Sequence, residues 1–288
     1  MAITYNNLYL DLRRRFREAG DLEPDRTARE LICSAAGKTN EEFVRDSRLY
    51  APPETEREAN ALAERCLSGE PVAYLIGEWE FYGVPLDISE AVLIPRPDTE
   101  VLAARAIEMA SAYDAPRVLD LCAGSGCVGL ALAKHVPDAR VLLGELDDKA
   151  ISICRRNIRR NALSSRVSVI RVNALEQPPR QLGEFDVIVS NPPYIPTADI
   201  DTLDASVREH EPRLALDGGA DGLDFYRAIC ALWRDALRPT GKLLFEVGIG
   251  QADTVLRLMR AGGFGDVQIV KDYNGIPRVV CGTRWDTV

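Results

Sequence analysis

The tetrapeptide Asn191-Pro192-Pro193-Tyr194 contains residues whose types and order could carry out chemistry. Two successive prolines have no backbone N–H. The segment therefore offers mainly acceptors, namely the side-chain carbonyl of Asn191 and the main-chain carbonyl of Pro192. Two convergent acceptors suit an NH₂ group, because it has two hydrogens to donate. Tyr194 adds a flat ring against which a planar group can stack. We therefore predict that the segment binds a planar NH₂ group.

The reaction predicted for such a site follows from the weak nucleophilicity of a planar amine or amide, whose lone pair is delocalised. Acceptors that hold both hydrogens direct the lone pair toward an electrophile and stabilise the positive charge that develops on nitrogen. A sulfonium methyl group is an electrophile that needs neither a metal nor a covalent enzyme intermediate. Asn191 and Pro192 are thus candidate catalytic residues for methyl transfer. Taken alone, the tetrapeptide also fits a proline-rich turn that closes a strand.

A second candidate site is the glycine-rich segment 120–129, in which Gly124, Gly126 and Gly129 have the spacing G-x-G-x-x-G. We expect the first two glycines to allow a tight turn and close approach to a ligand, and the third to allow close packing of helix on strand. Glu145 lies 21 residues beyond Gly124, where its carboxylate could accept hydrogen bonds from both hydroxyls of a ribose. The pattern predicts an adenosine-containing cofactor, and a nicotinamide dinucleotide would fit it equally well.

Strands and helices are expected to alternate from residue 96 onward and to position these two segments. The apolar runs are 117–121, 141–143, 167–172, 185–190, 243–247, 267–270 and 278–281. Apolar runs separated by helices indicate a parallel sheet buried on both faces. We predict an α/β fold with a doubly wound, mostly parallel, seven-stranded Rossmann-like sheet. Its ligands would bind at the carboxyl ends of the strands, where the first and fourth strands should bring the glycine loop and the tetrapeptide face to face.

The chain before this sheet is predicted to be helical. Apolar residues recur at four-residue spacing from Leu8 to Phe16, which places them on one helix face. Thr39 and Glu42 have the spacing of a capping box. An approximate alternation broken at Gly83-Val84-Pro85 indicates a β-hairpin. The predicted parts are a small all-α bundle (1–76), a linking β-hairpin (77–95) and the cofactor-binding domain (96–288). The bundle could dock the substrate, or it could only pack on its neighbour.

The composition is that of an acidic globular protein, with a formal net charge of −9. Nucleic-acid binding depends largely on neutralising phosphates, so this balance argues against a DNA or RNA substrate. A local basic patch is nevertheless compatible with an acidic total. The seven cysteines include no C-x-x-C pair and there are only two histidines, so we expect reduced thiols and no metal site. We find no signal peptide in residues 1–15 and no apolar membrane span, and we expect a cytoplasmic monomer.

The two motifs together resemble those of a known family. D-L-C-A-G-S-G-C (120–127) combined with S-N-P-P-Y (190–194) resembles the class I methyltransferases that modify amino groups. The stretch I-P-R-P-D-T-E (94–100) is similar to the corresponding stretch of the peptide chain release factor glutamine N5-methyltransferases. Segments 77–83, 211–219 and 222–226 also resemble that family, so the likeness spans about residues 70 to 288.

The resemblance implies methyl transfer from S-adenosyl-L-methionine to the side-chain amide nitrogen of the glutamine in the Gly-Gly-Gln motif of peptide chain release factors. The implied cofactor-binding residues are Cys122, Ala123, Gly124, Ser125, Gly126, Glu145, Asn173, Ala174 and Asn191. Residues 122–126 would wrap the methionine and ribose, and residues 173–174 would border the adenine. The implied substrate-binding residues are Asn191, Pro192, Pro193 and Tyr194. Release factors would be the partner, and no stable nucleic-acid binding is expected.

Several interpretations remain open from the sequence. Arg96 and Glu100 could belong to the site or could be ordinary charges at a helix start. Asp120 could receive cofactor or backbone hydrogens, or could stabilise the glycine turn. An adenine-N6 or guanine-N2 methyltransferase of nucleic acid would use the same tetrapeptide but would need a basic recognition surface. A nicotinamide-dependent oxidoreductase would leave the tetrapeptide without a role, and a non-catalytic adaptor would not need it intact.

Overall fold

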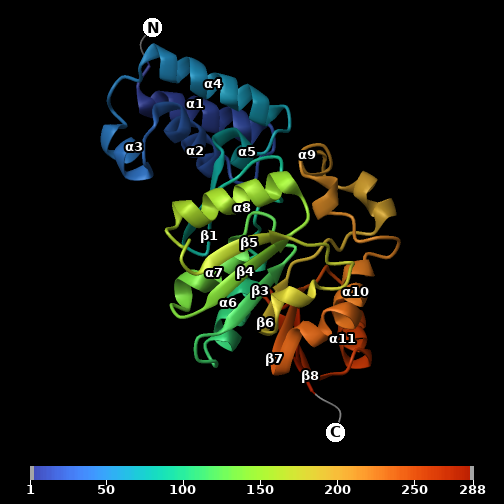
Figure 1. The fold of residues 1–288 in the computed structure, drawn as a ribbon. Coiled ribbons are helices and arrows are strands. Elements are labelled where there is room, and N and C mark those ends of the chain that lie inside the picture. The colour runs from blue at the N-terminus through green and yellow to red at the C-terminus, as the bar shows by residue number, and fades with distance from the viewer. Residues whose placement is uncertain (1–2, 286–288) are drawn as a thin grey trace. The chain divides into compact units, whose positions relative to one another are not determined.

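The computed structural model describes residues 3–285 and is drawn in Figure 1. Contacts divide the chain into two compact units. The helical unit consists of residues 1–78 together with 205–210, and the sheet unit consists of residues 79–204 together with 211–288. Residues 1–2 and 286–288, at the outer limits of the predicted domains, lie outside the described residues.

The helical unit is built from amphipathic helices around its own apolar core, as predicted. Its helices are α1 (Tyr5–Glu18), α2 (Pro24–Ala36), α3 (Asn40–Asp46), α4 (Pro53–Leu67), α5 (Val72–Ile76) and α9 (Ala205–Arg208). Leu8, Leu12 and Phe16 are all buried in this core. The capping box at the start of α3 is present, because the Thr39 side chain accepts from the backbone of Glu42 and the Glu42 side chain accepts from the backbone of Thr39.

The predicted hairpin is present as β1 (Glu78–Phe81) and β2 (Val84–Asp87). Its turn consists of Tyr82 and Gly83, which both have positive φ angles, of 50° and 71°. Two successive residues with positive φ are typical of the tight turns whose twist matches that of the flanking strands. The pattern break expected at Gly83-Val84-Pro85 thus falls one residue earlier, and Val84 already belongs to β2.

The sheet unit contains the predicted seven-stranded, mostly parallel sheet. Its strands are β3 (Arg117–Leu121), β4 (Arg140–Glu145), β5 (Val167–Arg171), β6 (Phe185–Ser190), β7 (Leu237–Glu246), β8 (Phe264–Lys271) and β9 (Pro277–Arg284). Their order is β5-β4-β3-β6-β7-β9-β8, and only β9 runs antiparallel to its two neighbours. Leu121 of β3 pairs with Ser190 of β6. The glycine loop and the tetrapeptide therefore leave neighbouring strands at the same edge, as expected.

Helices cover both faces of this sheet (Figure 1). One face is covered by α6 (Thr99–Ala110), α7 (Cys127–His135) and α8 (Asp148–Arg160), and the other by α10 (Asp224–Leu232) and α11 (Ala252–Ala261). Short 3₁₀ helices occur at Arg180–Leu182, Thr197–Thr202, Arg213–Ala215 and Arg234–Ala236. Among residues 3–285, no helix has the length and apolar character that crossing a membrane requires.

Candidate active site at the carboxyl edge of the sheet

The glycine loop connects β3 to α7 and contains three residues with left-handed backbone: Cys122 (φ 64°), Gly124 (φ 56°) and Gly126 (φ 81°). A Cβ added at Gly124 would meet no atom within 4 Å, whereas at Gly126 it would lie 2.8 Å from Leu143. A Cβ at Gly129 would overlap Leu143. Gly124 thus presents bare backbone to open space, where a ligand can approach. Gly126 and Gly129 are required by packing of the loop and α7 on β4, which is the role predicted for the third glycine.

Asp120 of β3 forms a hydrogen bond with the first turn of α7. Its buried carboxylate accepts the N–H of Gly129 at 2.8 Å. Burial raises the pKa of Asp120 to about 7, the Gly129 hydrogen bond opposes that rise, and the charge of Glu145 adds to it. Asp120 thus receives a backbone hydrogen, as one of the two open interpretations had it, and the same bond stabilises the glycine turn.

Glu145 is the last residue of β4 and faces the glycine loop. Its Oε2 accepts the N–H of Gly124 at 2.8 Å, and its Oε1 accepts the N–H groups of Leu146 at 2.6 Å and Asp147 at 3.0 Å. The backbone thereby holds an acidic group opposite the open side of Gly124.

Two buried side chains of α8 hold the loop from behind. Asn157 donates to the carbonyl of Ser125 at 2.9 Å, and it also exchanges hydrogen bonds with the backbone of Asp87 in β2. The Cys154 thiol donates to the carbonyl of Gly124 at 3.1 Å. Burial raises the pKa of the Cys154 thiol well above its usual range, so this group stays protonated and is available as a donor.

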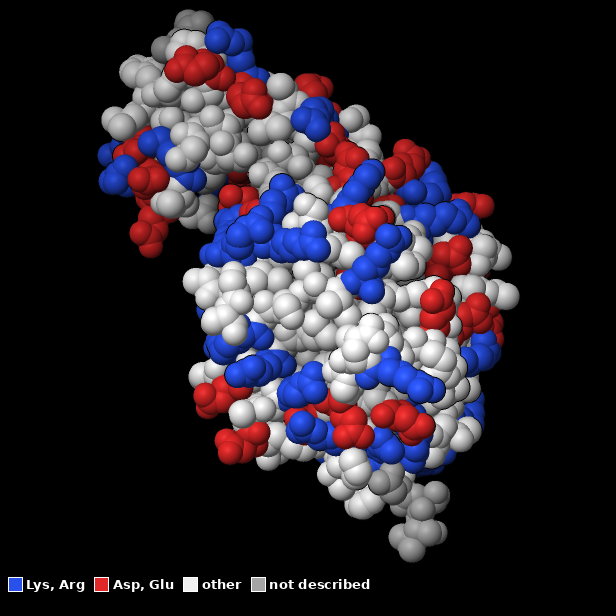
Figure 2. Space-filling view, in the orientation of Figure 1, with Lys and Arg blue, Asp and Glu red and all other residues white. Residues whose placement is uncertain are grey.

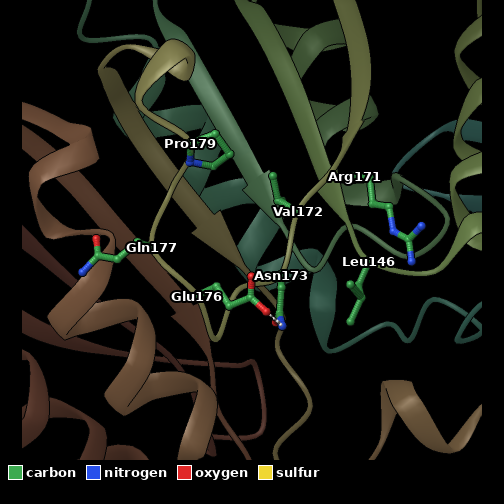
Figure 3. Close-up of a pocket in the computed structure, with 7 residues that line it drawn as sticks. All are labelled: Leu146, Arg171, Val172, Asn173, Glu176, Gln177 and Pro179. Carbon is green, nitrogen blue, oxygen red and sulfur yellow. Dashed lines mark hydrogen bonds between the residues drawn. The ribbon is translucent and has the colours of Figure 1, made fainter.

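A cavity of about 260 Å³ opens at the carboxyl ends of β4 and β5 (Figure 3). It is lined by Leu146, Arg171, Val172, Asn173, Glu176, Gln177 and Pro179. Two of these lining residues bond to each other, since Asn173 donates to Glu176 at 2.9 Å. Ala174 does not line it, because Ala174 is buried in the core and its carbonyl accepts from the indole of Trp233 at 3.0 Å. Of the two residues expected to border an adenine, Asn173 is thus the one that faces the cavity.

The tetrapeptide follows β6 directly, and neighbouring loops fix its backbone. The amide of Gln251 donates to the carbonyl of Tyr194 at 2.9 Å. The two prolines are buried, whereas Asn191 and Tyr194 are each partly exposed. Burial raises the pKa of Tyr194 to about 12, and the charge of Glu246 adds to this shift. Tyr194 therefore carries a neutral phenol at any physiological pH.

The stretch 94–100 lies beside the tetrapeptide. Arg96 forms an ion pair with the buried Glu211, which also accepts the N–H of Ile94 at 3.3 Å. Asp98 pairs with Arg278 of β9 at 2.7 Å. Glu100 faces the hairpin instead, since its carboxylate accepts the N–H of Tyr82 at 3.3 Å. The charge of Arg96 thus acts on Tyr194 of the tetrapeptide, whereas Glu100 supports the hairpin turn.

The structure adds three residues that sequence reasoning missed. Thr99 at the start of α6 accepts from the Asn191 side chain at 3.4 Å. Glu246 at the end of β7 is a buried carboxylate beside Asn191. Gln251 holds Tyr194, as described above. The one available signal was Glu246 itself, since a carboxylate inside the apolar run 243–247 calls for a nearby partner.

Comparison with known proteins shows to which family this chain belongs. Residues 99–219 match the model of the methyltransferase small domain, and residues 8–77 match that of the PrmC N-terminal domain. The release factor glutamine methyltransferase of Geobacter sulfurreducens is 46% identical over 232 residues, which cover 80% of this chain and 79% of that protein. The enzyme of the same name from Caulobacter vibrioides is 36% identical over 286 residues, covering 99% and 98%. The chain belongs to the release factor glutamine methyltransferase family.

Membership of the release factor glutamine methyltransferase family confirms the resemblance drawn from the two motifs and the stretch 94–100. It also confirms methyl transfer as the reaction, and the nucleic-acid alternative is not favoured. The fold agrees: a solved methyltransferase from Pyrococcus furiosus, 19% identical, aligns with a TM-score of 0.54 over 77% of this chain and 98% of that chain.

Proposed function

We propose that the protein transfers a methyl group from S-adenosyl-L-methionine to the side-chain amide nitrogen of the glutamine in the Gly-Gly-Gln motif of peptide chain release factors. The observation that carries this proposal is the Asn191 amide, which follows β6 at the edge where the neighbouring strand β3 leads into the glycine loop. The relatives named release factor glutamine methyltransferase support the choice of a glutamine amide over a nucleic-acid base.

The chain's own residues fit the proposed cofactor. Gly124 has open space in front of its backbone. Glu145, at the end of the neighbouring strand β4, has a carboxylate that suits the hydroxyls of a ribose. The cavity bordered by Asn173 and by Leu146, the residue that follows Glu145, would take an adenine ring. When bound there, S-adenosyl-L-methionine would supply a methyl group on a positively charged sulfur.

The tetrapeptide would hold the substrate amide. Asn191 Oδ1 and the carbonyl of Pro192 would accept its two hydrogens, and the Tyr194 ring would stack on its plane. Fixing both hydrogens orients the nitrogen lone pair, and the two acceptors stabilise positive charge on that nitrogen as the N–C bond forms and the S–C bond breaks. Transfer of one of the two amide protons to solvent water then yields the neutral N-methyl amide.

The nucleic-acid alternative requires a basic surface, and arginines gather on the exposed side of α8. Figure 2 shows blue side chains gathered over α8, where Arg155, Arg156, Arg159 and Arg160 are exposed. Two of these four, Arg156 and Arg160, pair with Asp87. The single Asp87 carboxylate offsets one of these four positive charges, so a local positive excess remains within a chain of net charge −9. The relatives named release factor glutamine methyltransferase make a protein substrate the better match.

The test is to incubate the purified protein with isotope-labelled S-adenosyl-L-methionine and a release factor, and then to map the label by peptide mass spectrometry. We expect one methyl group on the glutamine of Gly-Gly-Gln. The matched control is the same release factor with that glutamine replaced by alanine, which should take up no label. Label in DNA or ribosomal RNA, with none in the release factor, would overturn the proposal in favour of the nucleic-acid alternative.

A further inference from the structure

The Asn191 side chain has two chemically opposite ends, and the proposed function needs one of them to face the substrate. Its Oδ1 accepts hydrogen bonds, whereas its Nδ2 only donates them. If the amide were turned by half a rotation, an NH₂ group would face the substrate NH₂ group, and neither could accept. Some neighbouring group must therefore fix the direction of this amide.

Glu246 is placed to do so. Phe245 of β7 pairs with Ser190 of β6, so Glu246, the last residue of β7, lies beside Asn191, the residue that follows β6. Glu246 is only 4% exposed. Thr99 of α6, which is 2% exposed, lies beside both and accepts from Asn191 Nδ2 at 3.4 Å. The three side chains thus form a buried polar group on the inner side of the Asn191 amide.

The direction of each hydrogen bond follows from what each group can donate. An ionised carboxylate has no hydrogen to give, so both Thr99 and Asn191 must donate where they bond to Glu246. The Thr99 hydroxyl has a single hydrogen, and once that hydrogen is directed to Glu246 the hydroxyl can only accept from Asn191. Glu246 Oε2 is buried and has no hydrogen-bond partner among the described residues. The inner side of Asn191 is therefore rich in acceptors, which attracts its NH₂ group and turns Oδ1 outward.

We propose that Glu246 is a positioning residue that acts directly and through Thr99 to hold the Asn191 amide with Oδ1 toward the substrate. The identity of the substrate rests on the proposed function, whereas the orientation of Asn191 is a property of the free protein. Neutralising Glu246 removes the constraint, because Thr99 can then donate to Asn191 Oδ1 and the amide can turn round.

Protonation of Glu246 supplies a natural way to neutralise it. Burial raises the pKa of Glu246 to about 7, against the hydrogen bonds from Thr99 and Asn191 that lower it. Other ionisable groups face Glu246 from the elements packed around it: Asp98, Cys127, Tyr194, Tyr226 and Arg278. A pH effect at Asn191 must therefore be assigned by substituting Glu246 itself.

The first experiment measures Asn191 in the free protein. The protein is labelled with ¹⁵N-asparagine, and the side-chain NH₂ signal of Asn191 is assigned by its loss in Asn191→Asp. We expect this signal to shift with a midpoint near pH 7 in the wild type and to lose that transition in Glu246→Gln. Asp186→Asn, which neutralises a buried carboxylate at the opposite end of β6, is the matched control and should keep the transition. A transition that persists unchanged in Glu246→Gln would overturn the proposal.

The second experiment separates positioning from binding. Glu246→Gln and Thr99→Val should each lower kcat for release factor methylation by at least about tenfold, as misaligned catalytic groups commonly do. S-adenosyl-L-methionine affinity by calorimetry should change less than about twofold. Thr99→Ser restores the hydroxyl and should recover most of the lost turnover. The wild-type kcat should fall as pH drops below about 7, and Glu246→Gln should lack that fall.

The outcomes distinguish this inference from the proposed function. Normal kcat in a folded Glu246→Gln protein would overturn the positioning role. If that variant does not fold, the pair Thr99→Val and Thr99→Ser decides, because equal turnover in both would also overturn it. If the wild type methylates no release factor, the proposed function fails, and the NMR titration still decides whether Glu246 orients Asn191.

Discussion

In the proposed function Asn191 provides one of the two acceptors for the substrate amide, and its loss should therefore act on turnover more than on folding. We predict that Asn191→Ala lowers kcat by about 10²-fold or more, as removal of a charge-stabilising group commonly does. The side chain is partly exposed, so little stability should be lost. Stopped-time assays with labelled cofactor measure turnover, and denaturant unfolding checks the fold. Asn274→Ala, in the exposed turn between β8 and β9, is the control. Turnover within a few-fold of the wild type would refute the role of Asn191.

Asp120 should make stability depend on pH in the opposite sense to an ordinary paired carboxylate. Burial raises its pKa from 3.8 to about 7 in the folded state, so folding favours the protonated form. The associated stability is fully present below about pH 4 and is lost as pH rises through 7, by an amount on the order of 4 kcal/mol. Asp120→Asn keeps an acceptor for the Gly129 N–H and removes this loss.

Urea unfolding at pH 4.5 and pH 7.5 tests this prediction. The difference in the free energy of unfolding, Asp120→Asn minus wild type, should be larger at pH 7.5 than at pH 4.5. Because Glu246 titrates in a similar range in both proteins, its effect cancels in the difference. Parallel stability curves for the two proteins would show that Asp120 does not titrate there. The sequence could single out Asp120, but its raised pKa depends on how completely α7 and β4 cover it.

The glycine loop should tolerate alanine differently at its two ends. At Gly129 the new Cβ would overlap Leu143, and we predict a loss of stability of about 1–3 kcal/mol from overpacking. At Gly124 the φ of 56° makes alanine strained by about 1–2 kcal/mol, and its Cβ would enter the open space assigned to the cofactor. Gly124→Ala should therefore lose more cofactor affinity.

The measurement compares both variants by urea unfolding and by calorimetric titration with S-adenosyl-L-methionine. We expect the affinity loss to be at least about tenfold greater for Gly124→Ala than for a folded Gly129→Ala. The reverse order would mean that the cofactor does not approach the loop at Gly124.

Much of this element-level arrangement could be predicted from the chain alone. The strand-and-helix alternation and the adjacency of the first and fourth strands follow from apolar runs and from the rules of parallel sheets. The first half of β7 could not be predicted, because the polar stretch 238–242 contains a proline and a glycine and is typical of a loop. The role of Thr99 was equally hidden, since its contact with Asn191 joins residues that lie 92 positions apart.

At the scale of the whole molecule, the sequence could predict a helical part and a sheet part but not every segment that belongs to each. Residues 205–210 lie within the sheet half of the sequence, yet their contacts place them in the helical unit. Such long-range contacts leave no periodic signal in one chain. The helical unit has its own apolar core. It therefore does not depend on the sheet unit to bury its apolar side chains. The substrate-docking role that the sequence left open stays a prediction.

The surface of the helical unit offers a way to test that role. Val44, Leu49 and Tyr50 are large hydrophobic side chains that are 59–68% exposed within seven consecutive positions. We predict that Val44→Glu combined with Tyr50→Ala raises KM for an intact release factor by roughly tenfold. Turnover of a short peptide containing Gly-Gly-Gln should be unchanged, because that peptide needs only the tetrapeptide and the cofactor.

Leu22→Glu is the matched control for this docking prediction, because Leu22 is also exposed and apolar but stands alone, at 97% exposure in the turn between α1 and α2. It should leave KM for both substrates unchanged. If Val44→Glu with Tyr50→Ala instead leaves the release factor KM unchanged while the protein stays folded, this surface does not dock the substrate. If both substrates lose turnover equally, the helical unit acts on the sheet unit and not on the release factor. Only a selective loss for the intact release factor supports docking, since remote contacts then contribute binding free energy that the glutamine alone does not.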